Sequence, residues 1–113
     1  MRPLEVNKYL YDIVHACELL NQWTSGKTLT DYSTDAFLRS AVERQFEIIG
    51  EALVQAIRLD TTLKSQISDT AKIIGFRNRL IHAYASLAHD IVWGIIEVNL
   101  PILQNEIKIL LGR

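Results

Sequence analysis

The segment that decides the fold is residues 33–58, STDAFLRSAVERQFEIIGEALVQAIR. Its apolar stripe recurs at intervals of three and four and consists of Leu38, Val42, Gln45/Phe46, Ile49, Leu53 and Ile57. This spacing matches the helical period and predicts one long amphipathic helix. We expect Ser33 or Thr34 to cap its N-terminus. Gly50 falls in the middle of the helix, where glycine is unfavourable unless it permits close packing of another helix.

The rest of the chain shows the same helical spacing in three further segments, at residues 3–23, 69–81 and 89–111. Residues 59–68 lack a long apolar period and are expected to form a connection with one helical turn around Leu63. Pro101 lies inside the last pattern, where its missing N–H predicts a kink or interruption near Asn99. Four to five helices with this spacing indicate an all-α antiparallel bundle.

The composition is that of a small globular domain. Its 113 residues predict a single domain over residues 1–113, and the few glycines (5) and prolines (2) favour helices over a β fold. No apolar run approaches the ~18 residues of a membrane helix, and no signal peptide is apparent, so we expect a cytoplasmic protein. The single cysteine, Cys17, lies on an apolar stripe and is expected to pack in the core. We expect no metal site, because metal-ligand spacing is absent among His15, Cys17, His82 and His89.

The charge distribution is more informative than the net charge. With 12 basic and 13 acidic residues the formal net charge is −1, so any attraction to nucleic acid must come from a local cluster. Residues 71–88, AKIIGFRNRLIHAYASLA, contain no Asp or Glu but carry Lys72, Arg77, Arg79 and His82. An uncompensated cationic segment of this kind is suited to binding a phosphate group.

The spacing of Arg77 and His82 limits how they can cooperate. Residues five apart lie roughly 140° from each other around a straight α-helix, so the two cannot share a face of an unbroken helix. Either the helix ends near Leu80 and His82 turns back toward Arg77, or a symmetry mate completes the site. Both arrangements place His82 at or beyond a helix C-terminus, where the helix dipole favours the protonated imidazole.

The same segment carries a resemblance to a known family. Arg77-Asn78-x-x-x-His82-x-Tyr84 resembles the R-x4-H-x-Y motif of the HepT-like branch of the HEPN (higher eukaryotes and prokaryotes nucleotide-binding) superfamily. The similarity extends to the flanking sequence at residues 74–84, 41–52, 90–93 and 100–101. It therefore covers nearly the whole chain.

This resemblance implies a HEPN-like helical bundle that forms a homodimer, in which two copies of the motif line a cleft at the interface. Active members are metal-independent endoribonucleases that need no cofactor and act as toxins of type VII toxin–antitoxin systems. Each is encoded beside an MntA-like nucleotidyltransferase antitoxin. That partner neutralises the toxin by transferring AMP from ATP to the motif tyrosine, here Tyr84.

The implied chemistry suits these residue types. Metal-free RNA cleavage uses the 2′-OH as an internal nucleophile and needs proton transfer and a cation for the developing phosphorane charge. His82 is suited to proton transfer near neutral pH, and Arg77 offers a planar fork of donors to phosphate oxygens. We expect Asn78 to orient His82 or bind a phosphate oxygen, and Arg79 and Lys72 to be RNA-binding residues.

Other interpretations remain open. The chain is alternatively a non-catalytic subunit that binds a nucleotide or docks a nucleotidyltransferase, or a plain interaction bundle. Asn78 is alternatively a helix C-cap, and Tyr84 an anchor for a turn between helices. The charged row on residues 43–51 is not an optimised solvated face, because Glu47 and Glu51, four apart, repel each other. One interpretation is that part of this row borders the cleft and orders Arg77.

Overall fold

The computed structural model describes residues 3–82 and 88–113. Residues 1–2 and 83–87, the latter including Tyr84, lie outside the described part, as does the side chain of His82. The described elements are α1 (Leu4–Thr24), α2 (Leu29–Thr34), α3 (Ala36–Leu59), α4 (Leu63–Gln66), α5 (Thr70–His82), α6 (His89–Gly94), the π-helical segment η1 (Ile95–Asn99) and α7 (Leu100–Leu110).

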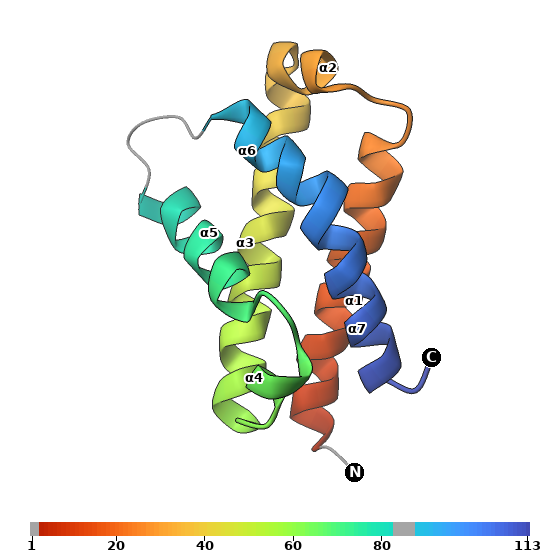
Figure 1. The fold of residues 1–113 in the computed structure, drawn as a ribbon, viewed down its shortest axis with the longest axis vertical. Coiled ribbons are helices and arrows are strands. Elements are labelled where there is room, and N and C mark those ends of the chain that lie inside the picture. Colours follow the sequence, from red (N-terminus) through yellow and green to blue (C-terminus); the bar gives the residue numbers. More distant parts are fainter. Residues whose placement is uncertain (1–2, 83–87) are drawn as a thin grey trace.

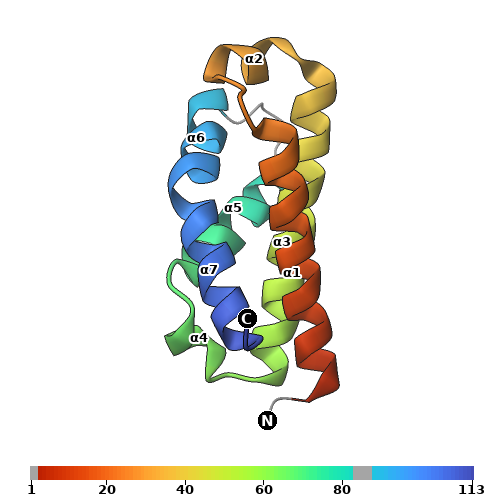
Figure 2. The ribbon, with the colours of Figure 1, turned by 90° about the vertical axis from the view of Figure 1, so that its right-hand side faces the viewer.

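Four long helical units form the bundle: α1, α3, α5 and the continuous run of α6, η1 and α7 (Figures 1 and 2). Successive units run in opposite directions, and α3 lies between α1 and α5. No β-strand occurs in residues 3–82 or 88–113. The predicted all-α bundle is therefore confirmed, and the short helices α2 and α4 lie in its connections.

The beginning of α3 differs from the prediction. The helix starts at Ala36 instead of residue 33, because Asp35 is the N-cap and its carboxylate accepts a hydrogen bond of 3.1 Å from the N–H of Leu38. Ser33 and Thr34 belong instead to α2, which the periodicity did not predict. This short helix is stabilised by a capping box, in which Thr28 and Asp31 each accept a hydrogen bond from the other's backbone N–H.

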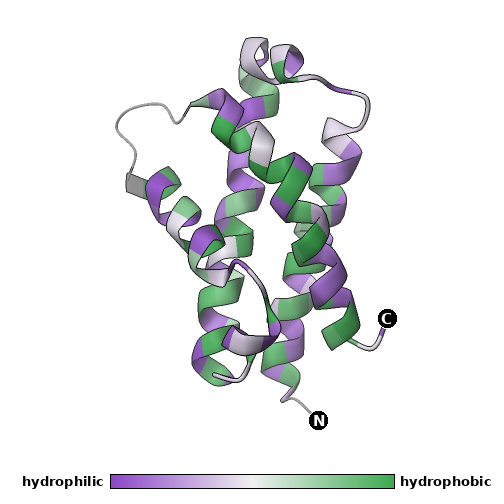
Figure 3. Ribbon diagram, viewed as in Figure 1, coloured by the Kyte–Doolittle hydropathy of each residue, from purple (hydrophilic) through white to green (hydrophobic). Residues whose placement is uncertain are grey.

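The helices are amphipathic, and their apolar faces form one hydrophobic core. Hydrophobic and hydrophilic residues alternate along each helix (Figure 3), and the predicted stripe of α3 is buried except for the half-buried Gln45 and Ile57. Cys17 is fully buried, and desolvation raises the pKa of its thiol to about 12, which confirms its packing role. Within the described ranges, none of the helices has the length and apolarity of a membrane span.

The last helix is interrupted where Pro101 predicted a disturbance. The N–H of Leu100 donates to the carbonyl of Ile95, five residues earlier, and this bond closes the π-helical segment η1. Pro101 has no N–H to offer the carbonyl of Glu97, and its ring crowds that carbonyl. A wider turn immediately before the proline relieves the crowding, so the helix continues as α7 instead of stopping.

The segment that leads into α5 is attached to this last helix. The N–H and hydroxyl of Ser68 donate to the carboxylate of Glu106, the hydroxyl at 2.8 Å. Asp69 has a left-handed backbone with φ of 55°, and its carboxylate accepts a hydrogen bond of 2.9 Å from the buried side chain of Asn99. These contacts fix the N-terminal end of α5, the helix that carries the cationic segment.

Candidate active site

The helix α5 packs on α3 through a narrow apolar face. Ile73 and Phe76 are buried, and the ring of Phe76 meets the ring of Phe46 on α3 edge to face, with the centroids 5.1 Å apart. Such a contact orients the two helices as well as burying apolar area. Arg77 follows Phe76 directly, so its side chain leaves α5 at the edge of this contact.

Gly50 is the point on α3 that the side chain of Arg77 crosses. A Cβ atom at position 50 would lie 2.3 Å from both Cβ and Cγ of Arg77, far closer than real atoms approach. The methylene stem of Arg77 therefore occupies the space that any other residue at position 50 would fill. The prediction that Gly50 permits close helix packing is confirmed.

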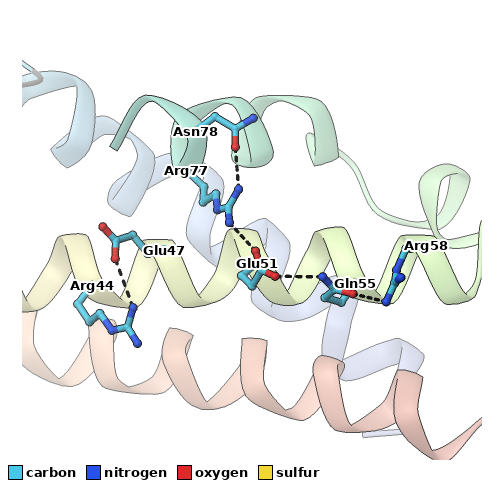
Figure 4. A network of polar contacts seen from close by, with 7 residues as sticks. All are labelled: Arg44, Glu47, Glu51, Gln55, Arg58, Arg77 and Asn78. Atoms are coloured by element: carbon cyan, nitrogen blue, oxygen red, sulfur yellow. Dashed lines mark hydrogen bonds and ion pairs between the residues drawn. The ribbon is translucent and has the colours of Figure 1, made fainter. Parts of the chain in front are cut away.

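The guanidinium group of Arg77 is held by two further side chains (Figure 4). Its Nη2 forms an ion pair with Oε2 of Glu51, and its Nη1 donates a hydrogen bond of 2.9 Å to Oδ1 of Asn78. The side chain of Arg77 is only 23% exposed. The interpretation that the charged row orders Arg77 holds for Glu51, whereas Glu47 pairs with Arg44 at 3.4 Å.

The helix predicted over residues 69–81 is confirmed as α5, and two of the alternatives for its end do not occur. The helix does not end near Leu80 but runs to His82, and Asn78 lies inside it, so Asn78 is not a C-cap. The side-chain oxygen of Asn78 contacts Arg77. The helix continues past Leu80 because no proline follows closely to stop it. Its one glycine, Gly75, lies before this point, and a Cβ there would meet no other atom.

The helical end of α5 excludes one of the two arrangements considered for the site. His82 is its last residue, as expected for a position at the helix C-terminus. Its backbone position lies roughly 140° around the helix from that of Arg77. Within one chain the two positions are on different faces of α5, so the arrangement that turns His82 back after Leu80 does not occur.

The remaining cationic residues of α5 lie on another face. Lys72 and Arg79 are both exposed, and, seven residues apart, they share one side of the helix. Lys72 borders a groove whose other walls come from α6 and η1, with Asp90, Ile91 and Val98 among the lining residues. The structure thus brings Arg77 together with Asn78, and Lys72 with Arg79, on separate faces.

The support of the Glu51 carboxylate along its own helix was not predicted from the sequence. Its Oε1 accepts a hydrogen bond of 3.0 Å from Gln55, and Oε1 of Gln55 accepts one of 2.6 Å from Arg58. The available signal was the position of Glu51 directly after the mid-helix Gly50. Among the residues that the structure describes, no group of three or more His, Cys, Asp or Glu side chains is placed to hold a metal ion.

An all-α bundle with an Arg-Asn-x3-His segment at the end of α5 is of the HEPN type. The chain matches the family described as "Ribonuclease HepT-like" over residues 13–110 and belongs to that family. Its class is therefore that of a nuclease enzyme. No solved structure matches the chain at a significant level.

Curated relatives are similar over nearly their full length. Several carry the name "Putative RNase": one from Methanocaldococcus jannaschii is 29% identical, covering 96% of this chain and 99% of the relative. Another, from Caldanaerobacter subterraneus subsp. tengcongensis, is 33% identical, covering 93% of both. A "Probable ribonuclease HepT" from Thermococcus cleftensis is 30% identical, over 88% of this chain and 90% of the relative.

The close approach at Gly50 predicts that Gly50→Ala is destabilising. We expect the free energy of unfolding to fall by about 1–3 kcal/mol from overpacking, which outweighs the roughly 1 kcal/mol that alanine gains in a helix. Gly75→Ala is the matched control, because a Cβ there meets nothing within 4 Å, and it should be neutral or stabilising. Urea denaturation measures both variants. A Gly50→Ala protein as stable as Gly75→Ala would contradict the observed packing of Arg77.

Proposed function

We propose that the protein is a metal-independent endoribonuclease whose active site is formed by Arg77, Asn78 and His82. The observation that supports this proposal is the fixed position of the Arg77 side chain. An arginine whose stem lies on Gly50 and whose head is held by Glu51 and Asn78 presents a planar set of donors in one orientation. Such a preorganised cation is suited to a phosphate that gains charge during the reaction.

The proposed reaction is attack of a ribose 2′-OH on the adjacent phosphorus. One proton leaves the 2′-OH, another is delivered to the departing 5′ oxygen, and the products carry a 2′,3′-cyclic phosphate and a 5′-OH. His82 at the C-terminus of α5 carries protons, since imidazole titrates near neutral pH. Asn78 accepts from Arg77 through its oxygen, which leaves its amide N–H groups to contact a phosphate oxygen.

We further propose that a homodimer completes the site. Because Arg77 and His82 occupy different faces of α5, Arg77 of one protomer acts with His82 of the partner subunit. A two-fold axis then produces two equivalent sites in one cleft. Lys72 and Arg79, exposed on a separate face, bind the RNA backbone on either side of the cleavage point.

The biological role we propose is that of a cytoplasmic toxin of a type VII toxin–antitoxin system. An MntA-like nucleotidyltransferase would neutralise it by transferring AMP from ATP to Tyr84, two residues after the end of α5. The added phosphate would bring negative charge into the cationic segment of the sequence, residues 71–88. Substrate RNA is then repelled, since phosphate groups of like charge compete for the same cation.

The catalytic proposal predicts that the unmodified protein cleaves labelled RNA in EDTA and leaves 2′,3′-cyclic phosphate ends. His82→Ala and Arg77→Ala should each lower the rate by ~100-fold or more, as expected for losing a proton-transfer group or the phosphorane cation. Gel electrophoresis of end-labelled RNA is the measurement. Undiminished cleavage by either variant would remove that residue from the site. No cleavage by the unmodified wild type would favour the non-catalytic docking subunit.

The composite site predicts complementation between the two inactive variants. Unfolding and refolding an equal mixture of Arg77→Ala and His82→Ala chains gives heterodimers with one intact site out of two. Since half of the randomly paired dimers are heterodimers, we expect about a quarter of wild-type activity. Separately refolded variants serve as controls. A mixture that stays inactive, with dimers confirmed by light scattering, would show that the site is formed within one chain.

The modification proposal predicts that the purified nucleotidyltransferase and ATP add AMP to the wild-type protein and abolish its cleavage of RNA. The change Tyr84→Phe removes the acceptor hydroxyl, so this variant should keep its mass and its activity in the same reaction. Intact-protein mass spectrometry followed by peptide mapping is the measurement. AMP found on Tyr84→Phe protein would place the modification on another residue.

A further inference from the structure

Glu51 connects Arg77 to a row of polar side chains along α3 (Figure 4). Its two carboxylate oxygens have different partners: Oε2 pairs with Arg77, and Oε1 accepts a hydrogen bond of 3.0 Å from Gln55. Gln55 is held in turn by Arg58 at 2.6 Å. Because these side chains are four and three residues apart, they share one face of the helix. The carboxylate of Glu51 is therefore oriented by its own helix as well as by Arg77.

Arg77 is fixed at both ends of its side chain. The stem lies over Gly50, where no Cβ fits, and the two terminal nitrogens bind Asn78 and Glu51. The Nε–H is buried and has no hydrogen-bond partner among the described residues, so this group does not set the orientation. The direction of the guanidinium plane therefore depends on Asn78 and Glu51.

The ion pair leaves Arg77 able to bind a phosphate. A guanidinium group has five N–H donors, and Glu51 and Asn78 each accept from one terminal nitrogen. Because the Nε–H is buried, the donors left for phosphate oxygens are the second N–H of Nη1 and the second N–H of Nη2, which can bind while Glu51 stays in place. The side chain of Glu51 is 49% exposed, and a pair this accessible to water adds little to stability. Its contribution is therefore to orientation.

We infer that Glu51 is a positioning residue, which holds the guanidinium of Arg77 in the orientation that meets the scissile phosphate. This inference rests on the proposed ribonuclease function. Two residues of α3 would then contribute to the reaction, although the motif on α5 does not include them. Gly50 leaves room for the methylene stem of Arg77, and Glu51 orients its guanidinium group. Preorganisation of this kind raises the turnover rate more than it raises substrate affinity, because it acts on the geometry of the transition state.

The test compares Glu51→Ala, Glu51→Gln and the matched control Glu47→Ala, which removes a negative charge one turn away. We expect Glu51→Ala to lower kcat by about 10-fold. Its KM should be unchanged or lower, because losing a negative charge beside Arg77 strengthens attraction to RNA. Glu51→Gln keeps an oxygen that accepts from Nη2 of Arg77 and should restore kcat to within ~3-fold of wild type. Glu47→Ala, whose carboxylate pairs with Arg44, should leave kcat unchanged.

A second readout does not depend on activity. The 15N-detected Nη resonances of Arg77 should be resolved from one another in the wild type and in Glu47→Ala, where Glu51 holds Nη2, and averaged to the position of a free arginine in Glu51→Ala. A resonance that does not change in Glu51→Ala overturns the inference, even if the wild type cleaves RNA. So does a rise in kcat shared by Glu51→Ala and Glu51→Gln, which would make Glu51 a competitor of the phosphate. If the wild type fails to cleave RNA, the proposed function fails, and the resonance still decides whether Glu51 orients Arg77.

Discussion

The contact between α3 and α5 at Gly50 is the constraint on which the candidate site depends. Because position 50 has no side chain, the stem of Arg77 lies directly against α3. The edge-to-face pair of Phe46 and Phe76 secures the same two helices nearby. Arg77 thus packs through its methylene groups while its guanidinium group makes polar contacts. Long cationic side chains can combine the two kinds of contact in this way. Burial of the stem fixes the place of the head, and Glu51 and Asn78 orient it.

The position of α5 is fixed at its N-terminal end by contacts with the last helix. Its N-terminal end is held to the last helix through Glu106 and through Asn99, which donates to the left-handed Asp69. Asn99 is the last residue of the π-helical segment that precedes Pro101. The proline on the last helix is therefore adjacent to the contact that begins the motif-bearing helix. At the other end α5 finishes at His82, so the candidate proton carrier lies at the helix C-terminus.

The electrostatics of the chain are local. A net charge of −1 provides no general attraction to RNA, and the cationic residues of α5 are divided between two faces. The carboxylate of Glu51 partly neutralises the positive charge of Arg77. In return, the ion pair gives the guanidinium group a defined orientation. This arrangement fits a site that recognises one phosphate by geometry, and in the proposed function Lys72 and Arg79 would supply the less specific attraction.

The long helices and the family are predictable from the sequence alone, because helical periodicity and the motif depend on residues that are close in the chain. The stripe of α3, the burial of Cys17 and the disturbance before Pro101 were all predictable in this way. The remaining features depend on contacts between residues that are distant in the chain. The helix α2 is too short to show periodicity, and its Tyr32 is buried against Trp93 of a distant segment. The pairing of Arg77 with Glu51, 26 residues apart, depends on how α5 packs on α3, and no local pattern in the sequence encodes that packing.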